Sequence, residues 1–209
     1  MDDVPFTPEH FTRLDNSDDG EFYAPARLVT HLDDPGIAAL SDFYRRFVPA
    51  GGDVLDLMTS WISHLPDDVA YGSVAGLGMN RDELDANERL GERVIHNLNT
   101  APRLPFDDAA FDACLIALSV QYLTQPLDVF GEIARVLKPG GGCAISFSNR
   151  CFPTKAVEIW RALNDSGHIW LVQEYFRRAG GFDEAVVEDL SSGGMMADPL
   201  YVVTARRMR

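Results

Sequence analysis

The sequence has little cysteine and almost no lysine. Its 209 residues hold three cysteines, an odd number that does not suit a disulfide framework, and Cys114 and Cys143 lie inside apolar runs. We interpret all three as reduced and not as metal ligands, so no metal site is expected. Lys138 and Lys155 are the only lysines, and 18 basic residues face 32 acidic ones. The net charge of −14 disfavours nucleic acid and anionic lipid as partners.

Long hydrophobic segments are also missing. No apolar run approaches the roughly 20 residues of a membrane-spanning helix. The segment Met1-Asp2-Asp3 lacks the basic and apolar regions of a signal peptide. We therefore expect a cytoplasmic protein with no membrane partner, built around one core. The sequence leaves the oligomeric state open.

Strand and helix patterns alternate along the chain. Apolar residues predict strands at residues 54–57, 71–77, 93–98, 111–120, 143–148, 182–190 and 200–206, and helices at 35–47, 81–90, 126–137, 156–163 and 169–178. This alternation is typical of an α/β sandwich with a parallel sheet. A loop at 191–199 would join the last two strands as an antiparallel hairpin at the sheet edge.

Amide and hydroxyl side chains gather where the predicted strands end. Ligands of open α/β sheets bind outside the carboxyl ends of the strands, so these segments are the candidate site. They comprise residues 58–64, 78–80, 97–99, 119–122 and 146–150.

Three segments resemble class I S-adenosylmethionine-dependent methyltransferases, most of all the small-molecule branch called type 11. These are Val-Leu-Asp-Leu at 54–57, Leu-Pro-Phe-Asp-Asp-Ala-Ala-Phe-Asp at 104–112 and Glu-Ile-Ala-Arg-Val-Leu-Lys-Pro-Gly-Gly at 132–141. The resemblance covers roughly residues 35–206. It implies a Rossmann-like three-layer sandwich whose seven-stranded, mostly parallel sheet has an antiparallel last strand. It also implies S-adenosylmethionine as cofactor and a small molecule as methyl acceptor.

The sequence departs from the family pattern at two places. The family's first loop continues as Gly-x-Gly-x-Gly, and here Met58, Ser60 and Ile62 stand at the glycine positions. A Cβ at each of them crowds the expected place of the methionine moiety. The acid that binds the ribose hydroxyls in the family is replaced by Gly78.

Eight residues are candidates for cofactor binding under this resemblance. Asp56 orders the first loop, and Asn80 is placed to contact the ribose, although it would equally serve as the N-cap of the helix that follows. Asn97 and Asn99 either meet the adenine or only form a turn. The full set is Asp56, Met58, Ser60, Gly78, Asn80, Asn97, Asn99 and Ser119.

Methyl transfer needs mainly positioning and exclusion of water, so a dedicated catalytic residue is not required. Where the acceptor must lose a proton, the candidates are His64, His31 and Tyr122. Tyr23, Gln121 and Tyr122 are expected on the substrate side. Each of these side chains could instead be purely structural.

Residues 1–32 form an N-terminal arm or lid ahead of a methyltransferase-like domain at 33–209. The arm is too short for its own core, and we expect it to cover the cofactor cleft with Tyr23 and His31 nearest the substrate. An acidic solvated tail is the alternative. A calcium loop in its acidic cluster is disfavoured, because Ala26 stands where a carboxylate ligand is needed.

Three functions remain at this point. The first is a methyltransferase acting on a small molecule, and the second is a methyltransferase-like binding protein that has lost catalysis. The third is a nucleotide-dependent oxidoreductase, which is disfavoured because Gly-x-Gly-x-x-Gly does not follow the first strand. Residues 140–142 are glycines but follow a helix, where they cannot hold a phosphate.

Overall fold

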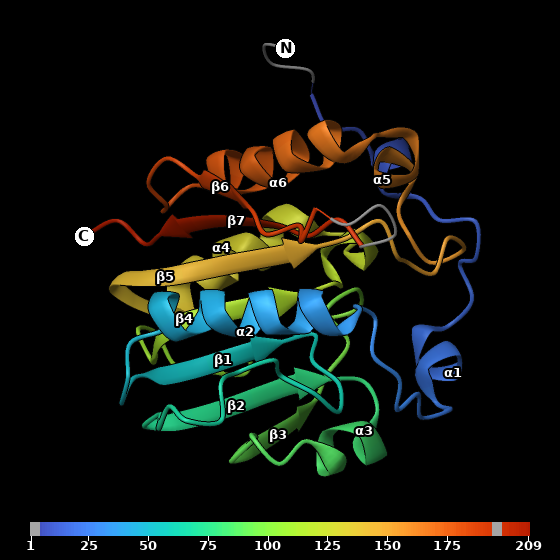
Figure 1. The fold of residues 1–209 in the computed structure, drawn as a ribbon. Helices are drawn as coiled ribbons and strands as arrows, with labels where there is room; N and C mark the ends of the chain where they lie inside the picture. Colours follow the sequence, from blue (N-terminus) through green and yellow to red (C-terminus); the bar gives the residue numbers. More distant parts are fainter. Residues whose placement is uncertain (1–4, 194–197) are drawn as a thin grey trace.

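A computed structural model describes residues 5–193 and 198–209 (Figure 1). Its sheet has seven strands in the order β3-β2-β1-β4-β5-β7-β6. The strands are β1 Asp53–Leu57, β2 Ser73–Gly78, β3 Glu92–Ile95, β4 Phe111–Ala117, β5 Leu137–Phe147, β6 Val186–Asp189 and β7 Tyr201–Arg206. Strands β1 to β5 pair in parallel, and β7 is antiparallel to both β5 and β6. The predicted fold class is confirmed.

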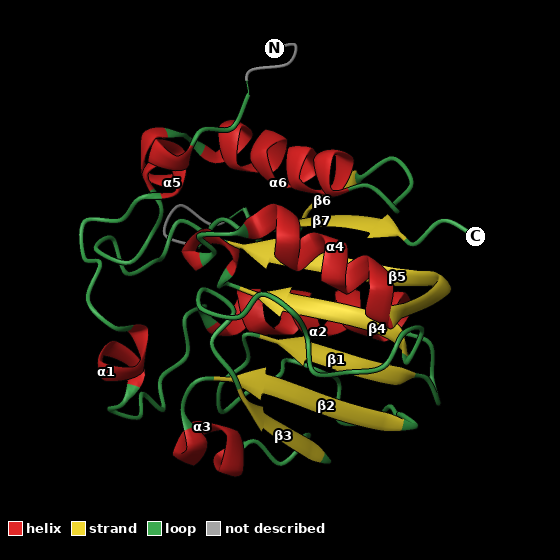
Figure 2. Ribbon diagram, turned by 180° about the vertical axis from the view of Figure 1, so that it is seen from behind, coloured by secondary structure: helices red, strands yellow, loops and turns green. Residues whose placement is uncertain are grey.

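Helices cover both faces of the sheet and make three layers. Helix α2 (Asp34–Phe47) lies on one face, and α4 (Pro126–Val136) and α6 (Asp165–Ala179) lie on the other (Figures 1 and 2). Two shorter helices, α3 (Arg81–Ala86) and α5 (Glu158–Ala162), follow β2 and β5 in the chain. Each face has its own apolar cluster, one packed with Phe130 and Tyr175 and the other with Leu40 and Tyr44.

The helix boundaries follow from capping. The Asp33 side chain accepts a hydrogen bond from the Gly36 N–H and starts α2, and the extended Val48 ends it. Pro126 occupies the first turn of α4, where a missing N–H costs nothing. Helix α3 ends at Ala86, four residues earlier than predicted, because the extended Asn87 interrupts it.

Strand β5 begins at Leu137, six residues before the predicted Cys143. The glycine-rich segment does not leave the sheet but forms an irregular stretch, and the register of β4 against β5 shifts between Phe111 and Ala113. Lys138 donates to Asp53 and Asp112 at 2.9 and 2.7 Å, which ties this stretch to β1 and β4. Part of the predicted loop at 191–199 lies outside the described residues.

The N-terminal arm packs against the domain over its described part, residues 5–32. It contains a short 3-10 helix, η1 (Pro8–Phe11), and one helical turn and a half, α1 (Asp19–Tyr23). Phe6 packs edge-on against Tyr175 of α6. From there the arm runs along the side of the sheet to which the parallel strands point (Figure 1). The described arm is therefore not a solvated tail.

Candidate functional site

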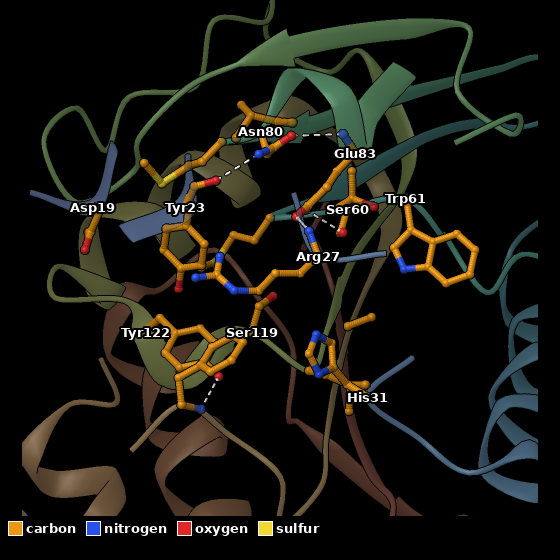
Figure 3. Close-up of a pocket in the computed structure, with 18 of the residues that line it drawn as sticks. Asp19, Tyr23, Arg27, His31, Ser60, Trp61, Asn80, Glu83, Ser119 and Tyr122 are labelled. Carbon is orange, nitrogen blue, oxygen red and sulfur yellow. Dashed lines mark hydrogen bonds between the residues drawn. The ribbon is translucent and has the colours of Figure 1, made fainter. Parts of the chain in front are cut away.

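A pocket opens at the carboxyl ends of β1, β2, β3 and β4, and the arm and the segment after β5 complete its wall (Figure 3). This is the edge that the topological rule selects. The lining residues are Asp19, Tyr23, Arg27, Val29, His31, Met58, Thr59, Ser60, Trp61, Ile62, His64, Leu77, Gly78, Met79, Asn80, Glu83, His96, Asn97, Leu98, Asn99, Ala117, Leu118, Ser119, Tyr122, Arg150, Cys151 and Phe152.

Asp56 orders the loop after β1, as the resemblance implies. Its carboxylate is buried and accepts a 2.6 Å hydrogen bond from the Thr59 hydroxyl. Burial raises the pKa of Asp56 to about 7, and hydrogen bonds with Ser63 and Thr59 oppose that rise. Asp56 is not among the lining residues, so it supports the pocket from behind. Met58, at the first glycine position, keeps the left-handed backbone (φ 57°) that glycine would adopt most easily.

The close approach of this loop explains Gly78. A Cβ on Gly78 would lie 2.3 Å from the Thr59 carbonyl oxygen, and the Thr59 N–H donates to the Leu77 carbonyl at 2.9 Å. The loop therefore occupies the space that a side chain at position 78 would need. In this protein the end of β2 cannot carry the family's acid.

Asn80 is the N-cap of α3 and also an anchor for the arm. Its Oδ1 accepts from the Glu83 N–H at 3.0 Å, and its Nδ2 donates to the Tyr23 and Ala24 carbonyls, both at 2.9 Å. The capping alternative is thus what the structure shows. A ribose contact through Asn80 stays a prediction, and it would compete with these bonds to the arm.

Glu83 is a pocket residue that the sequence reasoning missed. Its carboxylate accepts from the Ser60 hydroxyl and from the Arg27 backbone N–H, both at 2.7 Å. It therefore joins the β1 loop to the arm (Figure 3). Glu83 stands three residues after Asn80, which is the spacing of a capping box and could have drawn attention to it. Its carboxylate binds Ser60 and Arg27 instead of the backbone N–H of the N-cap.

Asn97 and Asn99 form a turn beyond β3. Asn97 accepts from the Asn99 N–H at 2.9 Å, and the Asn99 amide donates to Asp19 and to the Tyr122 carbonyl at 2.9 and 3.0 Å. The turn alternative accounts for both side chains, although both still line the pocket. Asn99 also holds the buried Asp19 of the arm, so it links β3 to the arm.

Two buried polar atoms of the pocket wall have no hydrogen-bond partner in the described protein, Ser119 Oγ and His64 Nδ1. Burial, with a smaller contribution from His31, lowers the pKa of His64 to about 4, so its ring is neutral at neutral pH. Unpaired buried polar atoms are costly unless something satisfies them. Both residues line the pocket, and the two atoms themselves are buried behind its surface.

The other predicted substrate-side residues divide into two groups. Tyr23, His31 and Tyr122 line the pocket. Gln121 does not, because its side chain turns inward and donates to the Leu118 carbonyl at 2.8 Å. The prediction that Gln121 flanks the substrate is therefore corrected. The Tyr122 hydroxyl accepts from the Phe152 N–H at 2.8 Å, which fixes its position.

The pocket offers no metal centre among the residues that the structure describes. In residues 5–193 and 198–209 no three His, Cys, Asp or Glu side chains are grouped so that they could hold a metal ion. The same ranges include no helix long and apolar enough to cross a bilayer.

The chain matches the model of a methyltransferase domain over residues 59–145. It is 32% identical over 102 residues to the biotin biosynthesis bifunctional protein BioHC of Teredinibacter turnerae, covering 49% of this chain and 17% of that protein. It is also 32% identical over 88 residues to the malonyl-[acyl-carrier protein] O-methyltransferase of a Marinomonas species, covering 40% of this chain and 32% of that protein. The matches thus span a third or less of these relatives' length.

The fold has solved counterparts. The crystal structure of the [4+2]-cyclase SpnF superposes with a TM-score of 0.61 at 17% identity, covering 88% of this chain and 89% of that one. Strand order and pocket position define a Rossmann-like methyltransferase fold. The methyltransferase-domain match over residues 59–145 and this fold support the class I S-adenosylmethionine-dependent methyltransferase superfamily.

Proposed function

We propose that the protein transfers a methyl group from S-adenosylmethionine to a small-molecule acceptor. The observation that carries the proposal is the pocket at the carboxyl ends of β1, β2 and β4, most of whose lining residues fall in the part of the chain that matches a methyltransferase domain. Ser119 and His64, each with an unpartnered buried polar atom, are among its lining residues. When bound, the cofactor supplies an electrophilic methyl group on a sulfonium.

Glu83 is our candidate for the acid that binds the ribose hydroxyls. Position 78 cannot hold an acid, and Glu83 brings a carboxylate into the same pocket from the helix that follows β2. Its two hydrogen bonds leave acceptor capacity, because an ionised carboxylate has about four lone-pair sites. Asp56 would contribute indirectly by holding Thr59 and the β1 loop.

Positioning and exclusion of water are the main tasks of the chain in this reaction. The arm places Tyr23 and His31 at the pocket, which is the arrangement that a lid requires. The lid remains a proposal, and it gives the arm a function beyond packing.

His31 is our candidate base for acceptors that must lose a proton. Partial burial lowers the pKa of His31 below its ordinary 6.5; Glu83 opposes this shift, and Arg150 and Arg27 add to it. The imidazole is therefore neutral at neutral pH and able to accept a proton. Tyr122 is unsuitable, because burial raises its pKa to about 12.

Calorimetric titration with S-adenosylmethionine and S-adenosylhomocysteine tests the proposal. We expect one site per chain for both compounds. Glu83→Gln should weaken binding about tenfold, the effect of losing a hydrogen bond to a charged group. Glu88→Gln is the matched control, since Glu88 is exposed, near α3 and outside the pocket. Absence of binding to the wild type would contradict the proposal.

A further inference from the structure

Arg27 brings an uncompensated positive charge to the pocket. Its guanidinium donates to the Phe22 and Pro25 carbonyls, at 2.8 and 3.3 Å, which ties it to the end of α1. Within the described residues no carboxylate lies within ion-pair distance of it. Two neutral acceptors leave most of its five N–H donors available. Figure 3 shows the side chain extending across the pocket toward Tyr23 and Tyr122.

Arg150 adds a second guanidinium on the same side. It lies just beyond β5, lines the pocket and keeps 58% of its side chain exposed. Only its Nε is engaged, with Asp198 at 2.8 to 2.9 Å, and its terminal nitrogens have no partner in the part of the chain that the structure describes. Phe152, two residues after Arg150, has its ring centroid 5.5 Å from the Arg27 guanidinium carbon, so both arginines adjoin the same part of the pocket wall.

An aromatic wall adjoins the two arginines. Phe152 is its centre and has ring centroids at 5.5 Å from Phe22, 6.0 Å from Tyr122 and 5.7 Å from His31. The Arg27 guanidinium lies 5.5 Å above the Phe152 ring. Stacking on aromatic faces orients a guanidinium and preserves its in-plane donors.

We propose that the methyl acceptor carries an oxyanion, carboxylate or phosphate, attached to an apolar body, and that Arg27 and Arg150 bind the oxyanion while the aromatic wall receives the body. This inference rests on the proposed function and specifies its substrate class. A guanidinium binds planar oxyanions through paired hydrogen bonds. A cationic acceptor would be repelled, and a neutral one would leave Arg27 without a counterion and the terminal nitrogens of Arg150 unused.

The test compares an acid with its neutral isostere. Benzoate and phenyl phosphate are the probes, and benzamide is the uncharged control, each titrated into protein saturated with S-adenosylhomocysteine. At least one oxyanion should bind tenfold or more tighter than benzamide. Arg27→Gln and Arg150→Gln should each reduce that affinity fivefold or more and leave benzamide binding unchanged. Arg46→Gln is the matched control, because Arg46 pairs with Glu188 on the exposed surface of α2.

The variants also separate the possible sources of the anion. If Arg27→Gln or Arg150→Gln weakens S-adenosylhomocysteine binding and not oxyanion binding, the arginines serve the cofactor carboxylate and the proposal is overturned. Equal affinity for acids and benzamide overturns it as well. Arg150→Gln controls for misfolding of the arm, since the Arg150 side chain binds Asp198 and not α1. Should the wild type not bind the cofactor, the same titrations without it still test the oxyanion site separately from the proposed function.

Discussion

Gly78 is required by the close packing of the loop after β1 against the end of β2. The Thr59 carbonyl approaches so closely that any Cβ there would overlap it. A backbone oxygen held by the β1 loop cannot move aside at low cost, unlike the end of a flexible side chain. The missing acid and the altered β1 loop, two separate departures in the sequence, are therefore one structural change.

The first prediction follows from that contact. Gly78→Ala should lower the free energy of unfolding by about 1–3 kcal/mol, the usual cost of forcing extra atoms into a packed site. Gly131→Ala is the control, because Gly131 is inside α4 and a Cβ there meets nothing within 4 Å. The free energy of unfolding of Gly131→Ala should rise by roughly 0.5–1 kcal/mol, because alanine has the better helix propensity. Urea unfolding measures both, and equal effects would contradict the packing argument.

Asp56 should make stability depend on pH. The unfolded carboxyl loses its proton near pH 3.8, whereas burial keeps the folded one protonated to about pH 7. Wild-type stability should therefore fall between these values, by at most about 1.4 kcal/mol per pH unit, and level off above pH 7. Asp56→Asn keeps an acceptor for Thr59 and removes the titration.

Urea unfolding of wild type and Asp56→Asn at pH 5 and pH 8 checks this expectation. The free energy of unfolding of the variant, relative to that of the wild type, should be higher at pH 8 than at pH 5, because only the wild type must bury an ionisable carboxyl. A difference between the two proteins that is the same at both pH values would show that Asp56 does not titrate in this range.

At the scale of elements, the arm is held by charge as well as by aromatic packing. Lys155, fully buried after β5, donates to the Ser17 carbonyl at 2.9 Å and lies 3.2 Å from Asp19 and 3.3 Å from Asp15. Arg13 pairs with the same Asp19 at 2.7 Å. This network fixes the arm next to the pocket, where Asn80 and Glu83 hold its following residues.

Lys155→Met should release the arm. The substitution removes one of the two cations that pair with the buried Asp19, which keeps Arg13, so we expect a cost of about 1.5–3 kcal/mol, the range for a hydrogen bond to a charged group. Amide hydrogen exchange should accelerate at residues 15–24 more than in the sheet. Lys138→Met is the control, since Lys138 is more than a third exposed and its pairs should contribute about 1 kcal/mol or less. Unchanged exchange in the arm would mean that its aromatic contacts alone hold it.

At the scale of the molecule, the sequence predicted the order of strands and helices because that order depends on local periodicity. Element ends were less accurate where capping decides them, as at Asn87. The carboxyl edge was also predictable, since it follows from topology. The roles of Glu83 and Lys155 were not predictable. Glu83 binds Arg27, 56 positions away along the chain, and Lys155 pairs with Asp19, 136 positions away. Such long-range pairs leave no periodic trace in one sequence.

The most direct test of the central claim is to map S-adenosylhomocysteine onto the protein by backbone amide chemical shifts. We expect the shifts to concentrate at residues 58–64, 78–83, 96–99 and 118–122, at the ends of β1, β2, β3 and β4, and to saturate with one ligand per chain. Shifts concentrated elsewhere, for example along β6, or no shifts at saturating ligand, would contradict the assignment of this pocket to a methyltransferase cofactor.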